Sequence, residues 1–284
     1  MKSLLGILLG ATLTVFLTNG AQAQSLTLYN AALGGFPASQ GSLAFGNVGT
    51  TPATETPFAA TQSSPAFTRL DSTSNAATYA GYSNRTATVG TSADPPFFTL
   101  TPGDYVNSAF PTLDRTSGFT LSFTIRQNSQ SSQSAVRAGF SVILLGSDSR
   151  GVELGFAGST IFSQAPGFTS AAESVTGANI GTLTGSLTAY TLNITGNTYT
   201  LATAGTTLLT GGVKDYTAAT GFAGNVYRST NFVFLGDDTT SAAGSTDFAF
   251  VAITTAPEPS AGLLCAAGLG LVVAARRRKS RPSF

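Results

Sequence analysis

The chain has 284 residues, and only 27 of them are charged: 14 are basic and 13 acidic. Histidine and tryptophan are absent, and there is a single cysteine. These counts exclude a Ser-His-Asp triad, a histidine-ligated zinc site, an intramolecular disulfide framework and a broad basic face for nucleic acid. Twenty phenylalanines and eight tyrosines can still build a core.

The first 23 residues have the pattern of a secretory signal peptide. Lys2 supplies a positive start, Leu4–Leu17 an apolar stretch, and Ala21 and Ala23 a small-x-small cleavage site. We therefore expect the mature chain to begin near Gln24. An uncleaved N-terminal anchor is the alternative, although the apolar stretch is short for a membrane span of about 20 residues.

The region between the two ends, 24–256, is expected to be one all-β domain. It has no 20-residue apolar run and no persistent 3.6-residue apolar stripe. Apolar and polar residues instead alternate in short segments, which indicates strands with one buried face. The predicted strands are an early edge strand at Leu26 and Leu28, then 119–126, a more fully buried 138–145, 151–156, 160–162, 190–194, 199–201, 232–235 and 248–253.

Turn and loop sequences separate these strands. Gly196-Asn197 joins 190–194 to 199–201 as a hairpin, and 146–149 forms another turn. Three further stretches are expected to be loops or breaks: the Thr/Ser/Pro-rich residues 49–66, Asp94-Pro95-Pro96, and the polar run 127–134.

Residues 257–284 form a second membrane-directed segment. An uncharged apolar run, Ala261–Ala275, follows a proline-rich start and precedes a basic cluster. Fifteen helical residues span about 22 Å, which is shorter than a hydrocarbon core of about 30 Å. The basic cluster would stay on the cytoplasmic side of the membrane.

This three-part end resembles the PEP-CTERM sorting signal of Gram-negative bacteria. The resemblance rests on the short apolar helix and on Pro257, Glu258, Pro259, Arg276, Arg277 and Arg278. It implies transient anchoring in the inner membrane, followed by recognition and cleavage by an exosortase, a membrane transpeptidase. The implied product is a cell-surface or extracellular-matrix protein of a bacterium that makes biofilm or exopolysaccharide. A permanent single-span anchor is the alternative.

The order of segments within 137–253 resembles the laminin-G/concanavalin-A-like jelly roll. The residues that carry this resemblance are 137–148, 151–156, the Tyr-x-Leu hairpin 190–201 and the return segment 234–242. It implies an antiparallel jelly-roll β-sandwich whose first and last strands pair, which would make 24–256 a single domain.

Carboxylates are the remaining candidates for catalysis. Before the tail there are three glutamates, Glu55, Glu153 and Glu173, and the Glu-x-Asp-x-x-Glu pattern of some jelly-roll glycosidases is missing. Retaining glycosidases need two carboxyl groups about 5–5.5 Å apart. Glu153 points away from the face of its apolar neighbours, so we expect a solvated residue or a partner of Arg150 or Arg137. We therefore assign no catalytic residue.

Two other clusters are candidates for binding. Asp237, Asp238 and Asp247, with Asp148 from another loop, provide oxygen ligands that suit Ca²⁺; the alternative is turn chemistry, because Asp caps its own backbone. Five tyrosines in loop-like sequence could stack on sugars, or else pack at the edges of the sheets: Tyr79, Tyr82, Tyr105, Tyr216 and Tyr227.

The sequence therefore predicts an exported, non-enzymatic β-sandwich that binds polysaccharide. The two alternatives are a jelly-roll glycoside hydrolase that depends on Glu153, and a purely structural coat with an uncharged, hydrated surface. Without the two terminal segments the body has 8 basic and 12 acidic residues. A net charge of −4 suits calcium or neutral glycans better than polyanions.

Overall fold

A computed structural model describes residues 23–48, 53–62, 64–74, 79–86, 105–132, 135–177, 185–219 and 226–256. The signal segment up to residue 22, the break at 94–96 and the whole sorting tail 257–284 lie outside these ranges, so those predictions remain predictions. Residues Ala23–Ala256 form one compact unit. Within the described ranges, no helix has the length and apolar character needed to cross a membrane.

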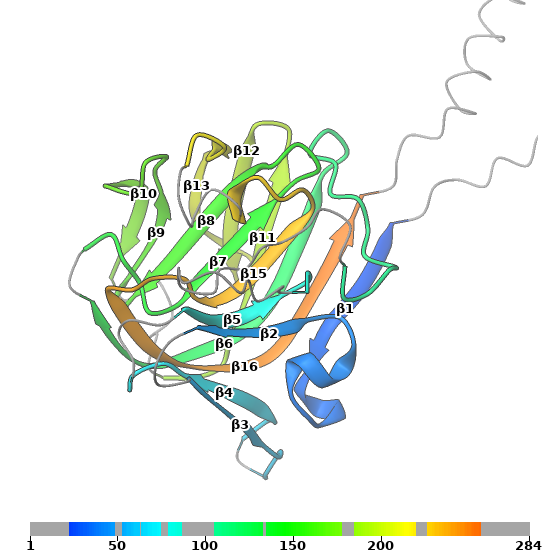
Figure 1. Ribbon diagram of the computed structural model, residues 1–284, viewed down its shortest axis with the longest axis vertical. Helices are drawn as coiled ribbons and strands as arrows, with labels where there is room; N and C mark the ends of the chain where they lie inside the picture. The colour runs from blue at the N-terminus through cyan, green and yellow to red at the C-terminus, as the bar shows by residue number, and fades with distance from the viewer. Residues whose placement is uncertain are drawn as a thin grey trace, which may run out of the picture. The chain divides into compact units, whose positions relative to one another are not determined.

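The unit consists of two antiparallel sheets (Figure 1). The strands of the first sheet are β1 (Gln24–Asn30), β3 (Thr54–Phe58), β4 (Phe67–Asp71), β6 (Phe119–Ser132), β11 (Thr188–Thr195), β12 (Thr198–Thr203), β13 (Thr206–Gly212) and β16 (Ala242–Thr255). They lie in the order β13-β12-β11-β6-β16-β4-β3, and β1 pairs with β16.

The strands of the second sheet are β2 (Ala44–Val48), β5 (Tyr79–Ser83), β7 (Ser141–Leu145), β8 (Arg150–Ala157), β9 (Thr160–Gln164), β10 (Ala171–Thr176), β14 (Lys214–Asp215) and β15 (Phe232–Asp237). They lie in the order β10-β9-β8-β7-β15-β5-β2, and β14 pairs with β8. Two short 3-10 helices, η1 (Ala31–Leu33) and η2 (Pro37–Gln40), follow β1.

The strongest alternating patterns are confirmed. Strand β6 alternates buried and half-buried side chains from Phe119 onward, and its buried phenylalanines and leucine enter the core between the sheets. The predicted hairpin is β11–β12, where Thr195 pairs with Thr198 across the Gly196-Asn197 turn. The predicted pairing of the first and last strands is also present, because β1 runs antiparallel to β16.

Two loop predictions are wrong. Residues 127–132 continue strand β6 and pair with β16 as far as Ala242, so their backbone groups are satisfied by a neighbouring strand although their side chains are polar. Residues 54–58, inside the predicted loop 49–66, form β3 and pair with β4. The side chains of β3 are largely exposed, and a strand without a buried face leaves no alternating pattern in the sequence.

The second sheet carries a second apolar layer on its outer face. Along β7, Val142 and Leu144 point into the core between the sheets, while Ile143 and Leu145 join a separate cluster. That cluster is completed by aromatic side chains from β15 and from the loops that cross the sheet: Tyr216, Tyr227, Phe232 and Phe234. The outer face of this sheet is therefore covered around β7, and the candidate site lies in the covering layer.

Candidate functional site

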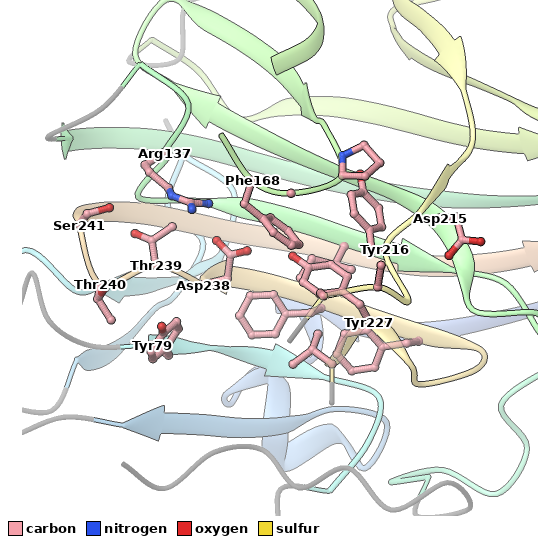
Figure 2. Close-up of a pocket in the computed structure, with 18 of the residues that line it drawn as sticks. Tyr79, Arg137, Phe168, Asp215, Tyr216, Tyr227, Asp238, Thr239, Thr240 and Ser241 are labelled. Atoms are coloured by element: carbon pink, nitrogen blue, oxygen red, sulfur yellow. The ribbon is translucent and has the colours of Figure 1, made fainter. Parts of the chain in front are cut away.

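A cavity of about 580 Å³ opens in this covering layer (Figure 2). Its walls come from the loop after β9, the segment after β14, the segment before β15, and the turn between β15 and β16. Aromatic and polar side chains from separate segments line it. They are Tyr79 of β5, Arg137, Phe168, Asp215, Tyr216, Tyr227, and Asp238, Thr239, Thr240 and Ser241 of the turn after β15. Most small-molecule sites have this mixture of apolar walls and a few polar groups.

Glu153 lies beneath this cavity, and the prediction that it is solvated is wrong. It pairs in register with Ile143 and does point away from Val152 and Leu154, as the alternation predicts. The face to which it points, however, is covered, and Glu153 is only 2% exposed. The hydroxyl of Tyr227 donates a hydrogen bond to its Oε2 atom, and its backbone N–H donates to the Tyr216 oxygen at 3.2 Å.

Asp238 completes a pair of carboxyl groups with Glu153. The two side chains share a hydrogen bond, and burial raises the pKa of both. The negative charge of Asp238 raises the pKa of Glu153 further, while the positive charge of Arg137 opposes both shifts. Asp238 lines the cavity; its side chain also accepts a hydrogen bond from Ser141, but no donor reaches its buried Oδ1 atom. A buried acceptor without a donor is rare in folded proteins and needs an explanation.

Phe168 forms the aromatic roof of the cavity. Its ring lies 4.9 Å from that of Tyr227 and 5.7 Å from that of Tyr216, and the guanidinium of Arg137 lies 5.9 Å from its centre. Figure 2 shows Arg137 and Asp238 beside this aromatic group, with Asp215 on its other side. The backbone of Phe168 has φ = 61°, an unfavourable region for a bulky residue. Such strain persists where the surroundings hold it in place, and it is frequent at functional sites.

The structure does not bring the three predicted calcium ligands together. Asp247 is fully buried between Arg69, at 2.6 Å, and Arg126, at 2.5 Å. Asp237 accepts hydrogen bonds from the Ser72 hydroxyl at 2.6 Å and from the backbone N–H of Thr239 at 3.1 Å. Within the described part of the chain, no group of three metal-binding side chains is present.

The capping of Thr239 by Asp237 is the turn chemistry that the sequence left as the alternative to calcium. Asp148, the fourth candidate ligand, instead pairs with Arg115 at 2.5 Å.

The five candidate tyrosines separate into two groups. Tyr79, Tyr216 and Tyr227 line the cavity. Tyr82 is buried in the core and donates to Glu55 at 2.7 Å, while Tyr105 stacks under the guanidinium of Arg85 at 4.0 Å. A platform of five tyrosines is therefore wrong, but three of the five do meet at one site.

The remaining glutamate and the other expected partner of Glu153 have structural contacts. Glu173 accepts from Lys214 at 2.7 Å and from the Tyr199 hydroxyl at 2.9 Å. Arg150 pairs with Asp215 at 3.2 Å rather than with Glu153. Of the two proposed partners, only Arg137 acts on Glu153.

Neither Phe168 nor the pairing of Glu153 with Asp238 was predicted from the sequence. An aromatic residue directly after Pro166-Gly167, where a turn is expected, is a signal that could have identified Phe168. The contact between Glu153 and Asp238 joins β8 to the end of β15, and no local pattern reports it.

No family model matches the chain, and no curated protein matches it. Among solved structures, the chain is similar to a carbohydrate esterase from the Shiga toxin-encoding bacteriophage phi24B, with 9% identity, a TM-score of 0.48, and coverage of 84% of this chain and 98% of that one. The binding domain of Paraclostridial Mosquitocidal Protein 1 matches with 11% identity, a TM-score of 0.39, and coverage of 73% and 44%. An endo-1,3-beta-glucanase from Streptomyces sioyaensis matches with 14% identity, a TM-score of 0.31, and coverage of 53% and 69%. Because these similarities are so distant, the function has to be inferred from the residues of the site itself.

Proposed function

We propose that this chain is an exported surface or matrix protein that binds saccharide units in the cavity roofed by Phe168. The observation that carries the proposal is the unpartnered Oδ1 atom of Asp238 at a cavity with aromatic walls. A sugar offers hydroxyl donors at its rim and C–H groups on its faces. It could supply the missing donor to Asp238 while it covers the ring of Phe168.

The short separation of the two carboxyl groups favours binding without hydrolysis. Glycosidases hold their two carboxyl groups about 5–5.5 Å apart for retention and about 6.5–9.5 Å apart for inversion. Glu153 and Asp238 are hydrogen-bonded to each other, which is closer than either arrangement. Glu153 is also buried, so it has no access to a glycosidic bond.

Export and sorting rest on the terminal sequences. The signal pattern of residues 1–23 and the Pro257-Glu258-Pro259 tail support delivery to the surface, with an exosortase as the processing partner. The finer assignment of the sandwich to the laminin-G/concanavalin-A-like jelly roll belongs to the same proposal. Deletion of residues 257–284 should move the protein from the envelope fraction into the medium or periplasm, and unchanged fractionation would refute sorting by this tail.

A glycan array probed with the full chain tests the binding proposal. We expect a subset of neutral glycans to be retained, and the Phe168→Ala variant to lose at least tenfold in affinity for them. Phe58→Ala is the matched control, because Phe58 is a half-exposed phenylalanine stacked on Phe67 in the other sheet. If no glycan is retained, or if both variants lose binding equally, the structural coat becomes the better interpretation.

A further inference from the structure

The outer face of the first sheet carries a row of three charged side chains, apart from the cavity on the second sheet. Asp247 of β16 pairs in register with Arg69 of β4 on one side and with Arg126 of β6 on the other. The next residues along the strands, Leu70 and Ile125, enter the core between the sheets. Because side chains alternate along a strand, the three charged groups lie on the opposite, outer face.

Asp247 holds both guanidinium groups through one carboxylate. Its Oδ1 atom accepts from Nε of Arg69 at 2.6 Å, and its Oδ2 atom accepts from Nη2 of Arg69 at 3.1 Å. The same Oδ2 atom accepts from Nε and Nη2 of Arg126 at 2.9 and 2.5 Å. Guanidinium nitrogens can only donate, so these four contacts suit an ionised carboxylate. Two positive charges therefore share one negative charge.

This two-to-one ratio distinguishes the cluster from the other ion pairs among the described residues. Each of those joins one cation to one acid: Arg115 to Asp148, Arg150 to Asp215, and Lys214 to Glu173. The next outward acid along β4 is Asp71, whose carboxylate accepts from the backbone N–H of Thr73 at 2.9 Å and from its hydroxyl at 2.5 Å. Arg69 and Arg126 thus keep one positive charge that no further acid contacts within the described residues.

Two stacked phenylalanines also contact the guanidinium groups. Phe58 on the edge strand β3 lies opposite Phe67 on β4, and their ring centres are 4.6 Å apart. The guanidinium of Arg69 lies 5.2 Å from the centre of the Phe58 ring, and that of Arg126 lies 5.1 Å from the centre of the Phe67 ring. A cation over an aromatic face is favourable. The rings and the carboxylate together hold both arginines in place before any ligand arrives, which lowers the entropic cost of binding.

These four residues, Phe58, Phe67, Arg69 and Arg126, form an arginine–phenylalanine patch that is open to a ligand. Phe58 is 38% exposed, and the side chains of Arg69 and Arg126 are 32% and 23% exposed. Among the described residues, the Nη1 atom of neither arginine has a hydrogen-bond partner, and neither atom is buried. The patch therefore presents free N–H donors and an excess positive charge beside a half-exposed ring.

We propose that the arginine–phenylalanine patch is a second saccharide site, which binds a uronate unit of an acidic polysaccharide. The sugar carboxylate would accept from the free Nη1 groups, because guanidinium groups match carboxylates in both geometry and charge. The C–H face of the sugar ring would cover Phe58. The net charge of −4 for the body disfavours polyanions at long range, so the binding depends on these contacts. The inference is independent of the cavity, which lies on the other sheet.

Calorimetric titration of the full chain tests this second site. The probes are the tetramers of glucuronate, mannuronate and galacturonate, the methyl ester of each, and a tetraglutamate peptide. In the chain used for titration, glutamine replaces the basic residues of the tail, so that the tail cannot bind the acidic probes: Arg276, Arg277, Arg278 and Lys279.

At neutral pH and low salt, we expect the tightest uronate to bind at least tenfold more tightly than its methyl ester and at least fivefold more tightly than tetraglutamate. Equal binding of the ester would show that the site does not recognise the charge, and equal binding of the peptide would show that it does not recognise the sugar. Either result, or no binding of any uronate, would overturn the inference and leave saccharide binding in the cavity untouched.

One pair of variants shows whether the patch itself is responsible. Arg126→Gln removes one guanidinium but leaves Asp247 paired with Arg69, and uronate binding should weaken at least fivefold. Arg228→Gln is the matched control, because Arg228 is an exposed arginine in the segment before β15 and forms no ion pair with any described residue. It removes the same charge and should leave uronate binding within twofold. Similar losses in the two variants would show that only net charge matters, which would overturn the inference.

A second pair separates the two saccharide sites and keeps the test decisive if a melting curve shows that Arg126→Gln fails to fold. Phe58→Ala removes a half-exposed ring at the sheet edge and should weaken uronate binding at least threefold. Phe168→Ala should leave uronate binding within twofold. Unchanged binding in Phe58→Ala would refute the contact with the sugar ring. Loss of uronate binding in Phe168→Ala alone would place the acidic ligand in the cavity and overturn the second site.

Discussion

Asp247 and Asp238 are two carboxylates at opposite ends of one turn-and-strand segment, and the protein buries them in different ways. Asp247 lies between two guanidinium groups, Arg69 and Arg126, so that its charge is overcompensated and all of its acceptors are used. Asp238 lies against another acid, Glu153, with one acceptor unused and a cavity in front of it.

Under the proposed function, this difference separates a structural role for Asp247 from a binding role for Asp238. A buried charge that is fully paired needs nothing further, whereas an acid beside an acid is unfavourable, and such pairs are frequent at functional sites. The calcium hypothesis grouped these aspartates by their nearness in sequence. Their partners show that each belongs to a different local structure.

The largest effect on stability is expected at Asp247. Asp247→Ala leaves Arg69 and Arg126 facing each other without their shared carboxylate, and loss of one partner of a buried pair costs about 3 kcal/mol or more. Urea unfolding measures this difference directly. Asp215→Ala is the control, because the exposed pair of Asp215 with Arg150 is worth only about 0–1 kcal/mol. Similar losses in the two variants would refute a structural role for Asp247.

The pH dependence of stability is the next largest effect. Burial raises the pKa of Asp237 to about 8, whereas the unfolded residue titrates near 3.9. Between these values the folded protein holds a proton that the unfolded chain has lost, so this contribution is complete at low pH and falls as the pH rises towards 8.

Replacement of Asp237 isolates this contribution. Asp237→Asn should remove a loss of about 1.4 kcal/mol per pH unit between about pH 5 and pH 7, measured as the slope of unfolding free energy against pH. Asp215→Asn should leave that slope unchanged, because hydrogen bonds from Thr217 lower the pKa of Asp215. An identical slope in Asp237→Asn and the original chain would refute the assignment.

A smaller effect is expected from the strained backbone at Phe168. Both Phe168→Ala and Phe168→Gly remove the ring, but only glycine tolerates φ = 61° without strain. We expect the glycine variant to be more stable than the alanine variant by about 1 kcal/mol, the reverse of the usual order. Thermal unfolding of the two variants gives the comparison. A more stable alanine variant would show that the turn relaxes and stores no strain.

The smallest effect is expected from metal removal. The aspartates once grouped as calcium ligands are held by Ser72, by Arg69 and Arg126, and by Glu153. Chelation should therefore leave the melting temperature within experimental error of its value in added calcium. A drop of several degrees on chelation, restored by calcium, would contradict the separation of these residues.

The sequence was sufficient to predict the structure where a strand has one buried face and pairs with a strand nearby in the chain. This held for β6, for the β11–β12 hairpin, and for the direction in which Glu153 points. It was insufficient where burial comes from distant segments. The loops that carry Phe168 and Tyr227 cover the outer face of β8, and alternation along β8 cannot report that cover. Strand β3 left no signal because neither of its faces is buried.

The most direct test of saccharide binding at the cavity is a crystal structure of the full chain soaked with the neutral glycan that the array retains most strongly. We expect a sugar ring against Phe168, with a hydroxyl group within hydrogen-bond distance of the Asp238 carboxyl group. A saccharide bound elsewhere on the sandwich, or a cavity filled only by water at saturating ligand, would contradict it.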